Sequence, residues 1–454
     1  MTAQYSSLKP SKNKFNGQIP SHWNDVPTRS VCKIKSVQNN IGEELLSVFL
    51  DRGVVRYSDT SGKQVHKPSD DMSKYQLVEP RDIVLNNQQA WRGSVGVSQY
   101  RGIVSPAYIV MSLDESINDR FVNYMIRNQA CVAQFVLASK GVGSIQRILS
   151  PTKLKSSYFT LPQKEEQDQI VRYLDWQTSQ INMLINAKKE QILLLEEKRN
   201  SFVFETVTKG VSSNRQTIAS NIYWLTEIPS SWDSIALSRI FAQVKHKNVG
   251  MEETNLLSLS YGRIIRRDIN ATEGLLPENF EGYNVIEPYD IVLRLTDLQN
   301  DQKSLRTGIA TEKGIVTSAY LTIRNKSENV SEYLQFVLHS FDLIKGFYNY
   351  GASGVRQGLN WDALKTLRIP LPPIPEQQAI VAAIKKEYFL TDTVISSIKK
   401  EIEVLLEYRS RIISDVITGK IDVRNIEIPN YEKAEEALDD NLAVSEELGL
   451  SEVD

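Results

Sequence analysis

The sequence repeats itself once at an interval of about 210 residues, and this duplication limits the possible folds more than any other feature. Ile-Pro-Ser-His-Trp at 19–23 returns as Ile-Pro-Ser-Ser-Trp at 228–232, and Glu-Pro-Arg-Asp-Ile-Val-Leu at 79–85 returns as Glu-Pro-Tyr-Asp-Ile-Val-Leu at 287–293. Further matches keep the same order along the chain: Gly102 with Gly314, Tyr108 with Tyr320, Gln167 with Gln377, and Val171 with Val381. The small changes in offset fit short loop insertions, which cost little free energy. The chain is therefore predicted to contain two similar halves.

Each half is predicted to contain a mixed domain of strands and a helix. Short apolar runs bounded by Gly, Pro, Asn and Asp are typical of strands in a small sheet or barrel. These runs lie at 45–50, 83–85, 103–110 and 291–295. One helix is expected in each domain, at 118–138 and at 331–345. A chain of 454 residues is long enough for two or three domains with their own cores.

A long helical pattern follows each mixed domain. Pro162 and the Pro-Pro-Ile-Pro run at 372–375 end the preceding strand, because proline cannot donate to a strand ladder. Apolar residues then recur every 3.5 residues over five heptads, which indicates packing of one helix against another. The predicted seam residues are Val171, Leu174, Ile181, Ile185, Ile192, Leu195 and Phe202 in the first copy and Val381, Ile384, Ile395, Ile398, Ile402, Leu405 and Ile412 in the second. Equal copies in one chain should pair with each other; the alternative is two separate core helices.

The predicted fold is α+β: two similar globular domains separated by two long antiparallel coiled-coil helices, related by an internal pseudo-two-fold repeat. The expected boundaries are 1–160 for the first domain, 161–212 for the first spacer helix, 213–372 for the second domain, 373–423 for the second spacer helix and 424–454 for an acidic tail. From 426 to 454 the chain carries ten carboxylates and only Lys433 as a cation, so we expect this tail to be disordered.

The charge distribution makes nucleic acid a candidate partner. The whole chain has a formal net charge of −2. Residues 426–454 carry −9, so the remaining residues carry +7. A modestly basic body suits a polyanionic ligand. On charge alone, however, a solvated body with a disordered tail explains the balance equally well.

Several kinds of chemistry are not predicted for this chain. The two cysteines, Cys32 and Cys131, are too few for a disulfide framework and are not spaced as zinc ligands. The sequence has no Walker-type loop, no Asn or Asp followed by Pro-Pro and an aromatic residue, and no helical pair of histidines. Its four histidines are dispersed: His22, His66, His246 and His339. We therefore expect no catalytic residue, no metal site and no cofactor bound by this chain.

The first residues and the hydropathy of the sequence predict where in the cell the protein is located. No apolar run approaches the roughly 18 residues needed to cross a bilayer, and the polar start at 1–14 lacks the apolar stretch of a signal peptide. We expect a cytoplasmic protein without membrane contact.

Long polar and guanidinium side chains in the variable loops are candidate base readers. Arginine pairs with guanine through two hydrogen bonds, and Asn or Gln does the same with adenine. The candidates are Arg56, Asn86, Asn87, Gln88, Arg92, Gln146 and Arg147 in the first domain and Arg263, Arg266, Arg267, Arg294, Arg306, Arg356 and Gln357 in the second. Two glycine-rich loops, 141–147 and 351–357, occupy equivalent places and both end in an Arg and Gln pair. A phosphate contact, a solvated charge or a simple turn explains any single one of them as well.

The two long helices could set a distance on DNA. A helix from 165 to 206 is roughly 60 Å long, which matches about 18 base pairs. Two reading domains held at such an interval would each meet a short sequence, with an unread gap between them. Because the two domains carry different loop residues, the target should be asymmetric, unlike the palindrome that a homodimer reads.

The repeated signatures together resemble those of specificity subunits of type I restriction-modification systems. They are the Ile-Pro-x-x-Trp motifs at 19–23 and 228–232, a proline followed by Gln at 162–167 and 375–377, and Thr-Lys-Gly at 208–210 with Thr-Gly-Lys at 418–420. The resemblance covers about residues 15 to 423. The first copy departs from the compact Pro-Glu-Gln-Gln of the second, with Lys-Glu-Glu-Gln at 164–167, which affects the expected start of its helix.

This resemblance implies a function and partners. The two globular domains would be target-recognition domains, and the chain would be a non-catalytic subunit that recognises a bipartite, asymmetric sequence in double-stranded DNA. It would direct two methyltransferase subunits and the restriction/translocase subunits of an antiviral defence system to that sequence. The partners would use S-adenosylmethionine, ATP and Mg²⁺, and binding to DNA would associate the chain with the nucleoid.

Two other functions remain open at this point. The chain could be a coiled-coil scaffold whose paired domains bind proteins and have no DNA specificity. It could also be a methyltransferase or nuclease that acts alone, in which case the purified chain should turn over a duplex. A two-part DNA motif enriched from random duplexes would distinguish the DNA reader from the scaffold.

Overall fold

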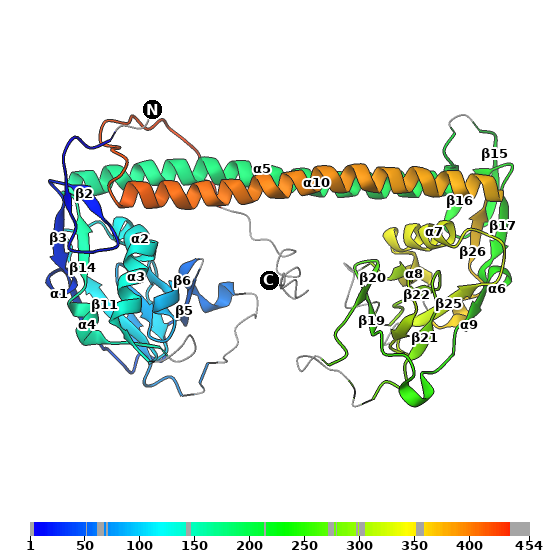
Figure 1. The fold of residues 1–454 in the computed structure, drawn as a ribbon, viewed down its shortest axis with the longest axis horizontal. Coiled ribbons are helices and arrows are strands. Elements are labelled where there is room, and N and C mark those ends of the chain that lie inside the picture. Colours follow the sequence, from blue (N-terminus) through cyan, green and yellow to red (C-terminus); the bar gives the residue numbers. More distant parts are fainter. Residues whose placement is uncertain are drawn as a thin grey trace. The chain divides into compact units, whose positions relative to one another are not determined.

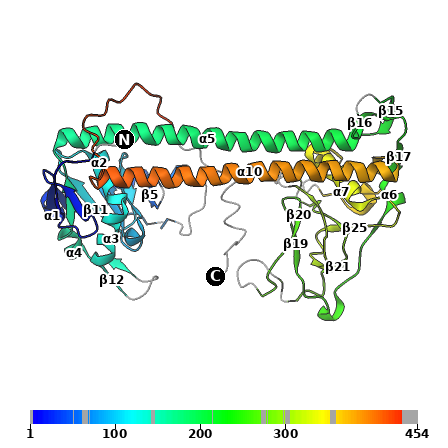
Figure 2. The same cartoon turned by 45° about the horizontal axis from the view of Figure 1, so that its top comes forward.

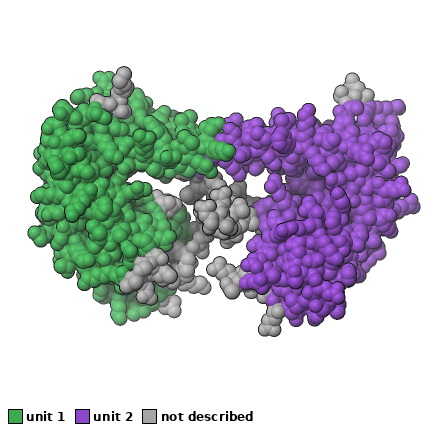
Figure 3. All heavy atoms as spheres, in the orientation of Figure 1, with its two compact units in different colours: residues 1–188, 400–454 green, residues 189–399 purple. Residues whose placement is uncertain are grey.

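The structure is a computed structural model that describes residues 4–50, 52–60, 68–69, 71–141, 147–212, 215–270, 277, 279–296, 298, 305–350 and 358–435. The chain divides into two compact units, residues 1–188 with 400–454 and residues 189–399 (Figure 3). Both divisions fall inside a long helix, so each unit contains a globular part and a segment of each long helix. The fold is mixed α and β.

The globular part of the first unit is built on a four-stranded antiparallel sheet with the order β4-β11-β8-β9. These strands are Cys32–Lys35, Tyr108–Leu113, Ile83–Asn86 and Val95–Val97. Strand β8 lies inside the sheet, and its Ile83, Val84 and Leu85 are fully buried. Burial on both faces explains why this strand is a continuous apolar run and does not alternate with polar residues.

Smaller strand pairs and short helices complete the first unit. The pairs are β1 (Leu8–Pro10) with β2 (Gln18–Pro20), β3 (Asn24–Pro27) with β14 (Tyr158–Leu161), β5 (Leu46–Phe49) with β6 (Gly53–Arg56), β7 (Gln76–Val78) with β10 (Gly102–Val104), and β12 (Ser139–Lys140) with β13 (Ile148–Leu149). The short helices are α1 (Thr28–Val31), η1 (Tyr57–Asp59), η2 (Ala90–Arg92), α2 (Asp119–Arg127), α3 (Gln129–Ala138) and α4 (Pro151–Lys155).

The single helix predicted over 118–138 is two helices. Asn128 ends α2 in an extended conformation, and its side chain accepts a hydrogen bond from the backbone N–H of Ala130. Asparagine is a favoured N-cap because its side-chain oxygen satisfies an N–H that the new helix leaves unpaired. This cap starts α3 in a new direction, which the apolar pattern alone did not reveal.

The globular part of the second unit has the same strand order, β18-β25-β22-β23. These strands are Phe241–Gln243, Leu321–Asn325, Ile291–Leu293 and Thr307–Ile309. Isolated parallel bridges also recur, Leu45 with Ile103 in the first unit and Leu256 with Ile315 in the second. The two globular parts therefore share one arrangement of strands.

The remaining elements of the second unit also form pairs and short helices (Figure 1). The strand pairs are β15 (Thr217–Ile222) with β16 (Leu225–Pro229), β17 (Asp233–Ala236) with β26 (Arg368–Leu371), β19 (Leu257–Ser260) with β20 (Arg263–Arg266), and β21 (Asn284–Ile286) with β24 (Gly314–Val316). The helices are α6 (Leu237–Ile240), η3 (Val249–Met251), α7 (Ser331–Leu343), α8 (Gly346–Tyr350) and α9 (Trp361–Leu364).

The two long helices are α5 (Lys164–Lys209) and α10 (Ile374–Ile417), and they run side by side in both views (Figures 1 and 2). In the first unit Arg409 Nη1 donates to Asn182 Oδ1 at 2.6 Å, and Lys188 pairs with Glu401. Residue numbers rise along α5 as they fall along α10, so the two segments are antiparallel. In the second unit Arg199 pairs with Asp392 at 2.7 Å.

The predicted seam residues lie on the inner sides of these helices to different extents. The buried ones are Val171, Leu174, Ile181, Ile185, Val381, Ile384, Ile395, Ile398, Ile402 and Ile412. Ile192, Leu195, Phe202 and Leu405 are half-buried. None of the helices in the described part of the chain combines the length and hydropathy needed to span a membrane.

Residues 424–435, here called the C-terminal segment, lie along α5 in the first unit. Ser179 Oγ donates to the carbonyl oxygen of Glu432 at 2.8 Å and accepts from the N–H of Ala434 at 2.7 Å. Gln169 Nε2 donates to the carbonyl oxygen of Ile426 at 2.8 Å, and Asn182 Nδ2 donates to that of Ala434 at 3.1 Å. Disorder was expected from residue 424, but this part of the tail is held in place through its backbone; residues 436–454 lie outside the described residues.

Candidate nucleic-acid interface

The Ile-Pro-x-x-Trp signatures belong to a buried polar joint in each unit. In the first unit Glu166 of α5 accepts hydrogen bonds from Tyr5 Oη at 2.7 Å and Trp23 Nε1 at 3.1 Å, and it contacts His22 Nε2 at 2.7 Å. Only 7% of Glu166 is exposed. An indole N–H buried without an acceptor would cost free energy, which explains why this tryptophan is matched to a carboxylate at the start of the helix.

The second unit has the same joint with an arginine in place of the histidine. Trp232 Nε1 donates to Glu376 Oε2 at 3.1 Å, and Arg215 pairs with the other carboxylate oxygen. Gly210, just after α5, has a φ of +81°, and a Cβ there would lie 2.6 Å from Glu376 Oε1. The glycine of the Thr-Lys-Gly signature thus allows the helix end to approach the joint closely.

The glutamine of the Pro-Glu-Gln signature ties the start of each long helix to its globular part. Gln167 Nε2 donates to the carbonyl oxygen of Pro162 at 2.9 Å, and its Oε1 accepts from the N–H of Asn118 at 2.9 Å. Gln377 forms the corresponding two bonds in the second unit, at 2.8 and 2.9 Å. The signatures are therefore structural joints between each long helix and its globular part.

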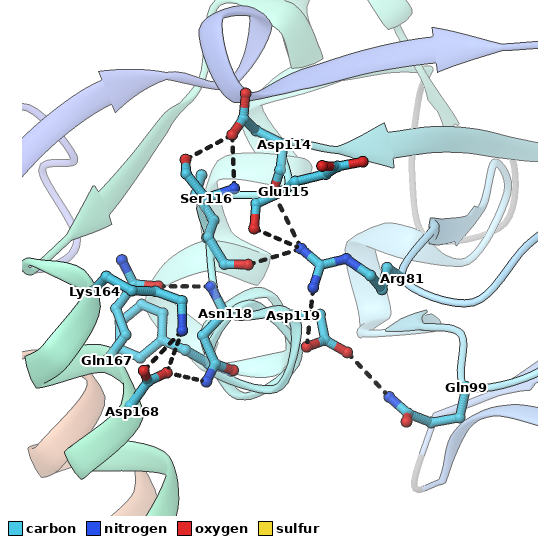
Figure 4. Close-up of polar contacts among 12 residues, drawn as sticks. Arg81, Gln99, Asp114, Glu115, Ser116, Asn118, Asp119, Lys164, Gln167 and Asp168 are labelled. Atoms are coloured by element: carbon cyan, nitrogen blue, oxygen red, sulfur yellow. Dashed lines mark hydrogen bonds and ion pairs between the residues drawn. The ribbon is translucent and has the colours of Figure 1, made fainter.

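A network around Arg81 continues this connection into the sheet of the first unit (Figure 4). Arg81 Nη2 donates to the carbonyl oxygen of Ile117 at 2.9 Å, and its Nη1 lies 3.9 Å from Asp119. Asn118 Nδ2 donates to Asp168 of α5 at 2.6 Å. Arg81 has a φ of +76°, which L-residues rarely adopt, and this conformation turns its side chain toward the loop before α2. The loop before α2 is therefore hydrogen-bonded to Arg81 on one side and to α5 on the other.

Three predicted base readers of the first unit gather around Trp91, a residue that the sequence did not single out. The guanidinium carbons of Arg92 and Arg147 lie 5.8 and 5.4 Å from the centroid of the indole ring. Trp91 Nε1 donates to the carbonyl oxygen of Gln88 at 2.8 Å. The N–H of Leu149 donates to the carbonyl oxygen of Asn87 at 3.0 Å and holds β13 against this loop. The sequence shows Trp91 beside Arg92. It does not show the contact between Trp91 and Arg147, because these two residues are far apart along the chain.

The other candidates of the first unit are Arg56, Asn86, Asn87 and Gln146. Arg56 ends β6, and its guanidinium lies 4.9 Å from the ring centroid of Tyr100 and 3.3 Å from Glu44. Asn86 Oδ1 accepts from the N–H of Gln88 at 3.0 Å. Asn87 Oδ1 is buried without a hydrogen-bond partner among the described residues. Gln146 lies outside the described residues, as does most of the loop at 141–147.

Three arginines of the second unit lie on or next to β20. Arg263 and Arg266 are each 73% exposed in their side chains, and Arg267 is also exposed. Arg266 pairs with Glu312 through two nitrogens, and the hydrogen bond from Arg266 lowers the pKa of the Glu312 carboxyl. Arg263 lies 3.7 Å from Asp392. Their charges are thus partly balanced within the unit.

The structure contradicts the prediction of a base reader at Arg306. Only 4% of Arg306 is exposed, and its Nη1 donates to the carbonyl oxygens of Arg294 and Thr296, each at 3.1 Å. Its backbone N–H donates to Asp342 at 2.6 Å. This guanidinium satisfies buried backbone carbonyls and cannot reach a groove. Arg294 is half-buried, and Arg356 and Gln357 lie outside the described residues.

Comparisons with known proteins show what this chain is similar to. Residues 306–404, from the residue before β23 of the second globular part into α10, match the family model described as the type I restriction modification DNA specificity domain. The resemblance to specificity subunits that the repeated signatures predicted is confirmed.

Two relatives from Methanocaldococcus jannaschii extend the match beyond this specificity domain. One, provisionally named a type I restriction enzyme MjaX specificity subunit, is 25% identical over 436 residues, covering 90% of this chain and 96% of its own. The type I restriction enzyme MjaVIII specificity subunit is 23% identical over 376 residues, covering 78% and 84%.

A solved structure shows the fold independently. The chain matches one described as the structural basis of complex assembly and conformational transition of the type I R-M system, with a TM-score of 0.60 and 14% identity. The match covers 89% of this chain and 99% of that one. In the described residues no group of three or more His, Cys, Asp or Glu side chains is placed to hold a metal ion.

Proposed function

We propose that the chain reads a bipartite, asymmetric sequence in double-stranded DNA as the specificity subunit of a type I restriction-modification enzyme. The observation that carries this proposal is the shared strand order of the two globular parts, whose loops carry different polar residues. The N–H of Leu149 donates to the carbonyl oxygen of Asn87 after β8, and in the second unit the N–H of Leu359 donates in the same way to that of Leu295 after β22. Asn86 and Asn87 of the first unit thus correspond to Arg294 and Leu295 of the second. Equivalent loops with different side chains should read different bases.

The long helices would set the gap between the two half-sequences. Helix α5 has 46 residues and α10 has 44. A helix of 46 residues is about 69 Å long, which equals about 20 base pairs of duplex. Pairing of two such helices as an antiparallel coiled coil would resist bending, so we expect one preferred gap length.

Partner subunits would supply the chemistry. Leu193, Leu194 and Phe389 of the second unit are mostly exposed although they lie on the long helices, and exposed apolar residues of this kind mark protein-binding surfaces. We expect two methyltransferase subunits to bind the helices and restriction/translocase subunits to join them. S-adenosylmethionine, ATP and Mg²⁺ would be bound by those partners. The assembly would act in the cytoplasm, on the DNA of the nucleoid.

Selection from a library of random duplexes tests this function. The full chain, alone and with the methyltransferase subunit of its host, is expected to enrich two short sequences at one spacing. A scaffold that binds proteins only would enrich no two-part motif. The chain alone, incubated with the selected duplex and methyl donor, is expected to transfer no methyl groups; turnover would identify a self-sufficient enzyme.

A further inference from the structure

Trp91 brings together two arginines that are far apart in the sequence. Arg92 is its neighbour in η2, and Arg147 precedes β13. The guanidinium carbons lie 5.8 and 5.4 Å from the centroid of the same indole ring. These distances are within the range at which a cation is attracted to the negative face of an aromatic ring. One ring thus contacts both cations.

The backbone around Trp91 fixes where this ring lies. Ala90 is fully buried, and Gly93 follows η2 with a φ of +104°. The N–H of Gly93 donates to the carbonyl oxygen of Ala90 at 3.0 Å, which closes the turn. The indole N–H is bound to the carbonyl oxygen of Gln88 at 2.8 Å. The backbone turn and the hydrogen bond of the indole N–H therefore fix the ring, although Trp91 is only half-buried.

A fixed ring changes what two arginines can do. Two guanidinium groups in water repel each other and explore many rotamers, and holding them still for a ligand costs conformational entropy. Contact with the ring offsets the repulsion and restricts the rotamers before any ligand binds. Arginine reads guanine or binds phosphate through its planar fork, so its orientation decides whether both hydrogen bonds can form.

The surface next to this pair suits a nucleic-acid groove. Arg92 is exposed, and Ile148, which follows Arg147, is 52% exposed. Lys140 lies opposite Ile148 in the β12–β13 pair and is also exposed. Two cations on an aromatic ring, a further cation and an exposed aliphatic side chain match the phosphates and the apolar edges of bases.

We infer that Trp91 is a specificity-determining positioning residue that holds Arg92 and Arg147 as one base-reading unit of the first target-recognition domain. This inference rests on the proposed function and deepens it. The ring acts through the two arginines and does not itself need to touch a base. Loss of the ring should therefore lower the discrimination between bases in one half-sequence and leave that in the other unchanged.

Substitutions at Trp91 and Arg147 in the full chain test the inference by the duplex selection described above. Trp91→Leu and Arg147→Lys are expected to lower discrimination at the same base positions of one half-sequence by roughly 2- to 30-fold, the range of a cation–π contact. Trp91→Tyr keeps a ring and should retain more discrimination than Trp91→Leu. The double variant should lose no more than the stronger single variant, because both residues act in one unit.

Controls separate this role from a purely structural one. Arg101→Lys changes an exposed arginine of the same unit that pairs with Glu43 and Glu79, and it should leave both half-sequences unchanged. The thermal midpoint of each variant should equal that of the unchanged chain. Full discrimination in Trp91→Leu, equal weakening of both half-sequences, or a loss that follows a lowered midpoint would overturn the inference. If the unchanged chain selects no two-part motif, the proposed function itself fails.

Discussion

Glu166 joins the N-terminal residues of the chain to the start of α5. It accepts hydrogen bonds from Tyr5 and Trp23, and it is 7% exposed. Glu166→Ala would leave both donors buried without an acceptor, which should lower the free energy of unfolding by about 1 to 3 kcal/mol. The urea midpoint of the first unit, followed by tryptophan fluorescence, measures this. Glu165→Ala, at the exposed neighbour, is the matched control and should change the midpoint little; equal effects of the two variants would contradict the role of Glu166.

His339 should make the stability of the second unit depend on pH. Burial, together with the nearby Arg199 guanidinium, lowers the pKa of His339 from its ordinary 6.5 to about 4. Between these values the unfolded chain binds a proton that the folded chain does not. Stability is therefore complete above pH 6.5 and should fall, by up to about 3 kcal/mol, as the pH approaches 4.

The test compares two glutamine variants, which cannot titrate. His339→Gln should flatten the decline of the thermal midpoint of the second unit between pH 6.5 and pH 4. His246→Gln, at an exposed histidine of the same unit, should leave the slope unchanged. A pH slope that is the same in the unchanged chain and in His339→Gln would show that other groups cause the decline.

Because the long helices pack through one face, neighbouring residues should differ sharply in how much their substitution lowers the free energy of unfolding. Ile185 of α5 is fully buried, whereas Leu184 is 54% exposed. Ile185→Ala leaves a cavity and should destabilise the first unit by about 2 to 5 kcal/mol. Leu184→Ala removes a similar side chain from the surface and should cost far less. Urea unfolding of both variants checks this, and a larger effect at Leu184 would contradict the observed pairing.

The C-terminal segment should stabilise α5 through backbone contacts. Its carbonyl oxygens at Ile426, Glu432 and Ala434 accept hydrogen bonds from side chains of α5. Removing residues 424–454 should lower the free energy of unfolding of the first unit by on the order of 2 kcal/mol. Removing only 436–454 keeps these contacts and serves as the control. Equal midpoints for the two truncations would show that the segment contributes nothing.

At the scale of the whole molecule, the helices should determine the gap in the DNA target. Removing 189–195 from α5 and 395–401 from α10 deletes one heptad from each helix and preserves the 3.5-residue register. The helices become shorter by about 10 Å, so the preferred gap should decrease by about three base pairs while both half-sequences stay the same. Duplex selection with all gap lengths measures this. Glu190→Ala, an exposed position in the same heptad, keeps the helix length and is the control. An unaltered gap in the deletion variant would refute the proposed role of the helices.

Much of the fold could be predicted because its patterns are local or repeated. The 3.5-residue period marked both long helices, and the central strands β8 and β22 appeared as continuous apolar runs. The duplication predicted two similar halves, and the two units share one strand order. Such patterns persist in a sequence because each depends on the spacing of residues along one element.

By itself, then, the sequence determined the repeat, the long helices and the resemblance to specificity subunits. Only the tertiary structure decided which polar side chains are exposed. Arg306 and Arg92 look alike in the sequence, yet Arg306 is buried against backbone carbonyls and Arg92 is exposed beside Trp91. The physical reason is that burial and hydrogen bonding depend on neighbours far away in the chain, as when Arg147 reaches Trp91 or when residues 424–435 lie along α5. No pattern along one segment records such contacts.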